Sequence, residues 1–174
     1  MRYDQLEHAI RAACEVADDS DVLIFGSQAL LGTFPHAPEQ LRTSIEIDIQ
    51  PRNKPEMVDY VDGALGEGSL FHQTHGFYVH GISIEVAQLP RGWEERVVVV
   101  THPVGTRGRR GLCLEAHDLA ASKLVAYRDK DRQFVALLLT EGLIAKDVLV
   151  ERVEQLPVDS EKIQILKRWI AAFV

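Results

Sequence analysis

Two neighbouring stretches decide the fold, VLIFGSQALLG at residues 22–32 and SIEIDI at residues 44–49. The first begins with a short run of β-branched and aromatic side chains that ends at Gly26, a composition typical of a buried strand. The second alternates strictly between polar and apolar residues, which predicts a strand with one buried face. The polar face of this second strand carries two carboxylates, Glu46 and Asp48.

The Gly26-Ser27 pair lies where the first predicted strand passes into a predicted helical turn. A glycine lets a phosphate come close to the backbone, and the free N–H groups at the start of a helix attract an anion. The Ser27 hydroxyl can donate a hydrogen bond to a phosphate oxygen. A strand followed by glycine and a helix occurs in many folds for packing reasons alone, so the pair is informative only together with other residues.

Glu46 and Asp48 are two positions apart on a strand, so their side chains point to the same face. Carboxylate oxygens are the hard ligands that Mg²⁺ or Mn²⁺ prefers. Ions held in this way bridge nucleotide phosphates and activate an attacking hydroxyl. A plain solvent-exposed strand face has the same pattern, and from the pair alone both interpretations stay open.

A third carboxylate is expected on the strands that follow. The runs Phe77–Val79 and Ile82–Val86 predict two strands, joined by a hairpin at His80-Gly81. Glu85 lies on the polar face of the second run and is therefore a candidate third ligand of the metal.

The rest of the chain predicts helices and two short strands. Amphipathic helices are expected over residues 2–18 and 55–65, and strands over 97–100 and 112–114. Four further helices are expected in the C-terminal part, near residues 115–129, 131–142, 146–155 and 160–173.

These elements predict an α+β fold with a mixed β-sheet, flanking helices and a helical C-terminal part. We expect an α/β core over residues 1–105 and a helical part over residues 106–174 that packs on the core. Cys14 and Cys113 are far apart in sequence and are expected to be buried free thiols.

The first two stretches resemble the opening of the DNA-polymerase-β-type nucleotidyltransferase superfamily, whose motif is Gly-Ser, a spacer and Asp-x-Asp. Within it they look like the toxin-related AbiEii/MenT-like group. A second block, residues 117–131, resembles a later helix of that family. The chain departs from the motif in having Glu46 where the family has aspartate, and in a longer spacer between Ser27 and Glu46.

The resemblance implies a fold of the nucleotidyltransferase type and roles for residues of the second block. Lys123 and Arg128 would bind the triphosphate, and Asp131 would support the site. Lys123 and Asp131 would share one helix face. A lysine is a strong point charge for phosphate, which makes the role of Lys123 physically reasonable. An ordinary amphipathic helix is the alternative interpretation of this block.

The activity that the resemblance implies is metal-dependent transfer of a nucleoside monophosphate from an NTP to an acceptor hydroxyl. Mg²⁺ or Mn²⁺ would be held by Glu46, Asp48 and Glu85, with Gly26 and Ser27 at the nucleotide. The acceptor could be the 3′ end of tRNA, and the protein could be the toxin of a pair with a cognate antitoxin. The alternative is a nucleotide-binding or protein-interaction module that has lost catalysis, which the glutamate at position 46 favours.

The overall charge and hydropathy narrow the range of partners. A net charge of −7 argues against broad affinity for nucleic acid, although Arg107, Arg109 and Arg110 form a local basic cluster. This cluster is either a contact for an anionic ligand or a solvated face. No apolar stretch approaches the roughly 20 residues of a membrane span, and the N-terminus is unlike a signal peptide. We therefore expect a cytoplasmic protein without membrane contact.

Overall fold

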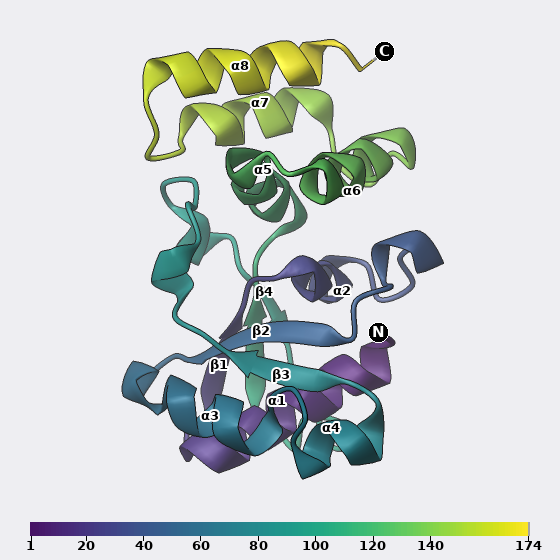
Figure 1. Ribbon diagram of the computed structural model, residues 1–174, viewed down its shortest axis with the longest axis vertical. Coiled ribbons are helices and arrows are strands. Elements are labelled where there is room, and N and C mark those ends of the chain that lie inside the picture. The colour runs from purple at the N-terminus through teal and green to yellow at the C-terminus, as the bar shows by residue number, and fades with distance from the viewer. Residues whose placement is uncertain (174) are drawn as a thin grey trace. The chain divides into compact units, whose positions relative to one another are not determined.

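Five strands form one mixed open sheet in the computed structural model, which describes residues 1–173 (Figure 1). Their order across the sheet is β3 (Tyr78–Gly81), β2 (Glu46–Pro51), β1 (Asp21–Ile24), β5 (Arg110–Cys113) and β4 (Val98–Val100). β2 runs parallel to β3 and antiparallel to β1, while β5 runs parallel to β1 and antiparallel to β4. The sheet belongs to one structural unit, which comprises Met1–Val86 and Val97–Leu114.

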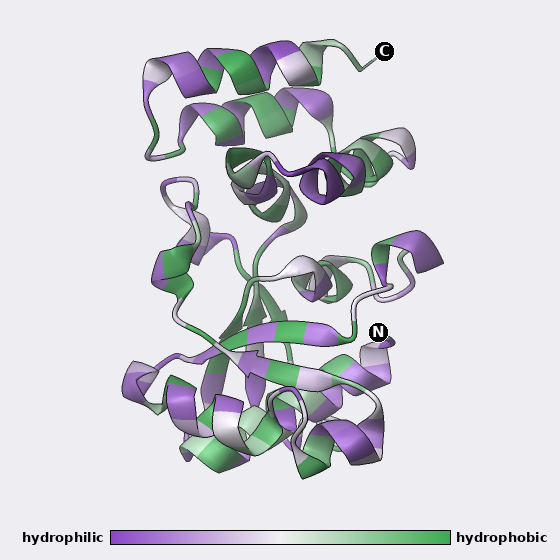
Figure 2. Ribbon diagram, in the orientation of Figure 1, coloured by the Kyte–Doolittle hydropathy of each residue, from purple (hydrophilic) through white to green (hydrophobic). Residues whose placement is uncertain are grey.

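The burial of the two deciding strands confirms both predictions. Every residue of β1 is buried, as expected for a central strand. In β2, Ile47 and Ile49 are fully buried, whereas Glu46 and Asp48 remain partly exposed. Figure 2 shows this alternation of hydrophobic and hydrophilic residues along β2. One face of the strand therefore contributes to the core, and the other presents two carboxylates.

Helices of the same unit pack against the sheet. α1 (Tyr3–Ala17) and α3 (Val58–Leu65) contact each other and strands β2 and β3, while the short α2 (Leu30–Thr33) contacts β4 and β5. Buried residues recur along α1 at the spacing of one helix face. They are Leu6, Ala9, Ile10, Ala13, Cys14 and Ala17. Asp18 ends this helix in the left-handed conformation.

The second structural unit comprises Ala87–Arg96 and the chain from Glu115 onwards. Its helices are α5 (Ala116–Ala126), α6 (Asp129–Thr140), α7 (Lys146–Glu154) and α8 (Ser160–Ala171). α5 contacts the other three helices, and α7 lies beside α8 (Figure 1). The helices expected from sequence in this region are confirmed within a few residues at each end.

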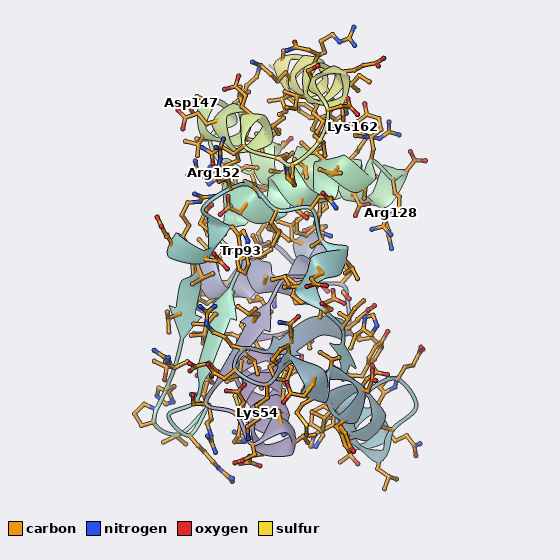
Figure 3. The ribbon with its side chains drawn as sticks, turned by 90° about the vertical axis from the view of Figure 1, so that its left-hand side faces the viewer. Lys54, Trp93, Arg128, Asp147, Arg152 and Lys162 are labelled. Carbon is orange, nitrogen blue, oxygen red and sulfur yellow. The ribbon has the colours of Figure 1, made fainter. Side chains whose placement is uncertain are left out.

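A buried charge cluster fixes the segment 87–96 to these helices. Asp118 is fully buried in α5 and accepts two hydrogen bonds from Arg96, at 2.8 and 3.0 Å. Arg152 of α7, which Figure 3 labels, approaches the same carboxylate to 3.3 Å. Burial raises the pKa of Asp118, against the hydrogen bond and charge of Arg96. A buried carboxylate requires such partners, because an unpaired charge in the interior is costly.

The predicted hairpin at His80-Gly81 is wrong. Both residues belong to β3, and the chain then forms a 3₁₀ helix at Ile84–Val86 in place of a second strand. The chain leaves the sheet here, and the Ile84 N–H donates to the side chain of Gln50, at 2.8 Å, in place of a strand partner. The alternation of apolar residues after Gly81 therefore does not belong to a strand.

Two helical features were also not foreseen. A short helix, α4 (Leu70–His75), lies in a glycine-rich region for which no element was predicted; the Ser69 hydroxyl caps its N-terminus and Gly76 ends it in the left-handed conformation. Tyr127 also adopts the left-handed conformation, with φ 54°, and ends α5. Lys123 and Asp131 are therefore on two successive helices, and their predicted place on one helix face is wrong.

Two smaller expectations can be compared with the structure directly. Cys14 and Cys113 are buried free thiols, as predicted, and burial raises the pKa of each to about 12. Within residues 1–173, every helix is too short or too polar to span a bilayer.

Candidate active site

The edge of the sheet brings four polar side chains together. β3 is the edge strand, and its register with β2 places Tyr78 opposite Glu46 and His80 opposite Asp48. Side chains of residues that face each other on neighbouring strands point to the same side of the sheet. The polar face of β2, predicted from its alternation, is therefore extended by a phenol and an imidazole.

His80 contacts both carboxylates. Its Nδ1 atom lies 2.9 Å from Asp48 Oδ1 and 3.1 Å from Glu46 Oε1. Burial lowers the pKa of His80, but the hydrogen bond to Asp48 and the negative charges of Asp48 and Glu46 outweigh burial and hold the pKa above its usual value. The imidazole is thus bound electrostatically between the two acids.

The same three residues have the arrangement of a metal site. One ligand atom from each of Glu46, Asp48 and His80 can be chosen so that all lie within 4.8 Å of one another. The side chains are 39%, 25% and 38% exposed, respectively, so an ion can reach them from solvent. Two carboxylates and an imidazole are suitable ligands for a divalent cation, and the residues present fit the metal that the sequence implied.

Tyr78 orients the first carboxylate. Its hydroxyl donates a hydrogen bond to Glu46 Oε2 at 3.3 Å, while the other oxygen, Oε1, faces His80. Burial and the charge of Glu46 raise the pKa of Tyr78 to about 12, so the phenol remains a donor at neutral pH. Glu46 is therefore held at one oxygen and presents the other to the site.

Gly26 packs directly against the second carboxylate. A Cβ atom at this position would lie 1.8 Å from Asp48 Oδ2. The backbone of Gly26, with φ −71° and ψ −170°, is extended and accessible to any residue, so the requirement for glycine comes from the carboxylate alone. The Phe25 N–H also donates to the Asp48 carbonyl, at 3.3 Å. The loop at Gly26 and Asp48 are thus in direct contact.

Ser27 follows as the first residue of a 3₁₀ turn, Ser27–Ala29, which continues into α2. It is partly exposed, and its hydroxyl accepts a hydrogen bond from the Gln28 side chain at 3.4 Å. The structure therefore places the predicted nucleotide-binding pair, Gly26 and Ser27, immediately beside Asp48.

Glu85 does not lie with these residues. It is an exposed residue of the 3₁₀ helix Ile84–Val86, and the group of potential ligands around Glu46 and Asp48 contains His80 instead. Sequence reasoning missed His80 because it placed that residue in a hairpin turn.

The site residues predicted in the second block form a group of their own, within the second structural unit. Asp131 is buried in α6 and accepts hydrogen bonds from Arg128 at 2.6 and 3.3 Å. Figure 3 labels Arg128, whose side chain is 62% exposed. Lys123 Nζ lies 3.6 Å from the same carboxylate and 4.9 Å from the centre of the Phe134 ring. Asp131 therefore holds two cationic side chains near each other.

The basic cluster near residue 108 is engaged with acidic groups. Arg107 forms an ion pair with Glu15 at 2.9 Å, and Arg110 donates to Asp21 at 2.6 Å. Arg109 donates to the Asp19 carbonyl at 3.2 Å. Part of the positive charge is therefore balanced within the first structural unit, which weakens the case for this loop as a nucleic-acid contact.

Comparison with known proteins identifies a family that covers nearly the whole chain. Residues 2–172 match the model of a family described as "Nucleotidyltransferase of unknown function (DUF6036)". No curated protein and no solved structure matches the chain.

Proposed function

Because this chain belongs to the DUF6036 family of nucleotidyltransferases, we propose that it transfers a nucleoside monophosphate from an NTP to an acceptor hydroxyl in a metal-dependent reaction. The observation that carries the proposal is the pair Glu46 and Asp48, which share a partly exposed face of β2 beside the Gly26-Ser27 turn. This combination is what the chemistry of phosphoryl transfer needs, namely metal ligands next to a place where phosphate can approach the backbone.

In this reaction an oxygen of the acceptor hydroxyl forms a bond to the α-phosphorus, and the bond from that phosphorus to the oxygen bridging to the β-phosphate breaks. The hydroxyl proton passes to solvent water, and pyrophosphate leaves. Mg²⁺ or Mn²⁺, held by Glu46 and Asp48, would neutralise phosphate charge and lower the pKa of the acceptor hydroxyl.

The protein's own groups then have separate tasks. Ser27 and the backbone N–H groups of its turn would hydrogen-bond phosphate oxygens, a role supported by the packing of the preceding Gly26 against Asp48. Tyr78 keeps Glu46 oriented. In the second structural unit, Lys123 and Arg128 would supply positive charge to the triphosphate, and Asp131 would fix their positions. Most of the rate enhancement would come from positioning and charge neutralisation.

The first acceptor to test is the 3′ end of tRNA, because the motif resembles that of the AbiEii/MenT-like group. A toxin role would in addition require a cognate antitoxin. Arg107 and Arg110 are paired with carboxylates and Arg109 donates to a backbone carbonyl, so we do not rest RNA binding on these arginines.

The purified chain should be incubated with each α-³²P-labelled NTP, Mg²⁺ or Mn²⁺, and total tRNA, beside the double variant Glu46→Ala/Asp48→Ala. We expect label to move to an acceptor with the wild type only. The assay is repeated with a cell extract as a further source of acceptors. If NTP binds in a metal-dependent way but no label is transferred to tRNA or to the extract, the protein is a nucleotide-binding module without catalysis. Absence of both transfer and NTP binding would refute the assignment of the site.

A further inference from the structure

We propose that His80 is a direct ligand of the metal and gives the site a preference for first-row transition-metal dications, such as Mn²⁺, over Mg²⁺. The inference rests on the proposed function, because it concerns the ion that Glu46 and Asp48 would hold. It goes further in naming a nitrogen ligand where the sequence had indicated a third carboxylate, Glu85.

The spacing of the donor atoms supports direct coordination. His80 Nδ1 lies 2.9 and 3.1 Å from one oxygen each of Asp48 and Glu46. Neighbouring ligands of an octahedral ion with bonds of about 2.1 Å are about 3 Å apart. Each oxygen is therefore already at the separation from the nitrogen that adjacent positions around one ion require, and the three ligand atoms offered by these residues can all lie within 4.8 Å of one another.

The three donors are also held in place by their surroundings. The pairing of β2 with β3 sets His80 opposite Asp48. Asp48 packs against Gly26, and Glu46 is fixed at its second oxygen by Tyr78. Ligands whose orientation is fixed by neighbouring contacts lose little freedom when an ion binds.

The chemistry of the nitrogen determines the preference. Mg²⁺ favours an all-oxygen environment and retains several waters, whereas imidazole is a good ligand for first-row transition metals. Two carboxylates and one imidazole form a mixed set that Mn²⁺ accepts readily. The substitution His80→Asp would give an all-carboxylate set and should favour Mg²⁺ relative to the wild type.

The test measures metal binding directly and does not depend on turnover. Mn²⁺ alone is added to the full chain, its affinity is determined by electron paramagnetic resonance, and the affinity for Mg²⁺ is determined by competition. Pulsed resonance then detects whether a ¹⁴N nucleus of an imidazole is coupled to the bound Mn²⁺. The variants are His80→Gln, His80→Asp and Asp48→Asn, with His36→Gln as a control at an exposed histidine in the loop after α2.

For the wild type and the control we expect ¹⁴N coupling and an affinity for Mn²⁺ at least about tenfold above that for Mg²⁺. His80→Gln should lose the coupling and bind Mn²⁺ at least about tenfold more weakly. His80→Asp should lose the coupling and reduce the ratio of the two affinities. Circular dichroism establishes that each variant is folded, and the wild-type spectrum is informative without any variant.

The outcomes distinguish this inference from the proposed function. If Asp48→Asn abolishes Mn²⁺ binding but the wild type shows no ¹⁴N coupling, the role of His80 is overturned and the carboxylate site remains. Mn²⁺ binding that is unchanged in Asp48→Asn would overturn the metal site of the proposed function, and this inference with it.

Discussion

The substitution Gly26→Ala is a sharp test of the geometry around Asp48. The added Cβ would lie 1.8 Å from Asp48 Oδ2, whereas ordinary contacts begin at 3.4 Å. The carboxylate must therefore move by at least about 1.6 Å. Because this displaces a metal ligand, we expect the affinity for Mn²⁺ to fall by about 100-fold, the upper end of the losses caused by disturbing ligand orientation. Alanine adopts the observed backbone angles, so no strain opposes the change in the loop itself.

The assay is the affinity for Mn²⁺, measured by electron paramagnetic resonance, together with the free energy of unfolding in urea. Because the Asp48 side chain is partly exposed and can rotate away, we expect the unfolding free energy to change by no more than about 0.5 kcal/mol. Gly63→Ala is the matched control, since this exposed glycine of α3 has nothing within 4 Å of an added Cβ. It should bind Mn²⁺ normally and be stabilised by about 0.4–1 kcal/mol. Wild-type affinity for Mn²⁺ in Gly26→Ala would refute the proposed contact between the glycine loop and the metal ligand.

Three further predictions concern other residues. Tyr78→Phe removes the hydrogen bond to Glu46 and should weaken Mn²⁺ binding about tenfold, the equivalent of about 1.5 kcal/mol for a bond to a charged group, in the same titration. Asp118→Ala removes the hydrogen-bond acceptor of Arg96 and the counter-charge of Arg152, both partly exposed, and should reduce the free energy of unfolding by about 2–3 kcal/mol in urea; a loss below 1 kcal/mol would contradict the importance of this cluster. The pKa of Asp19 lies below its usual value. Burial raises this pKa, but four hydrogen bonds from side-chain and backbone donors outweigh the effect of burial. Its stabilising contribution is therefore fully present above the unfolded pKa of about 3.9 and is lost as the pH falls through the lower folded pKa. Asp19→Asn should remove that part of the acid sensitivity, which urea titrations between pH 6 and about pH 2 would reveal. Identical pH profiles for the variant and the wild type would contradict this prediction.

The elements that could be predicted from sequence are those with a local pattern. The alternation around Glu46 and Asp48 defined a strand and its exposed face, because side chains of a strand alternate between faces whatever lies beside them. The helices of the C-terminal part were predicted for the same reason, from their local sequence pattern.

The role of His80 could not be predicted in this way, since it depends on the register between two strands that are far apart in sequence. Tyr78 and His80 alternate with Phe77 and Val79, both buried, which is the same local pattern as in the strand that carries the carboxylates. The sequence alone does not show that this strand pairs in parallel with β2, and the following glycine suggested a hairpin. The attachment of Arg96 to Asp118 is likewise a long-range contact without a local signal.

The most direct test of the proposed active site does not require the acceptor to be known. Binding of each NTP to the wild type and to Asp48→Asn should be measured by calorimetry, with Mn²⁺ or Mg²⁺ present and after chelation of the metal. We expect at least one NTP to bind to the wild type only when a divalent ion is present, and to lose that metal-dependent binding in Asp48→Asn. Binding that is equally strong without metal, or unchanged in the variant, would contradict a site in which Glu46 and Asp48 hold the ion that receives the nucleotide.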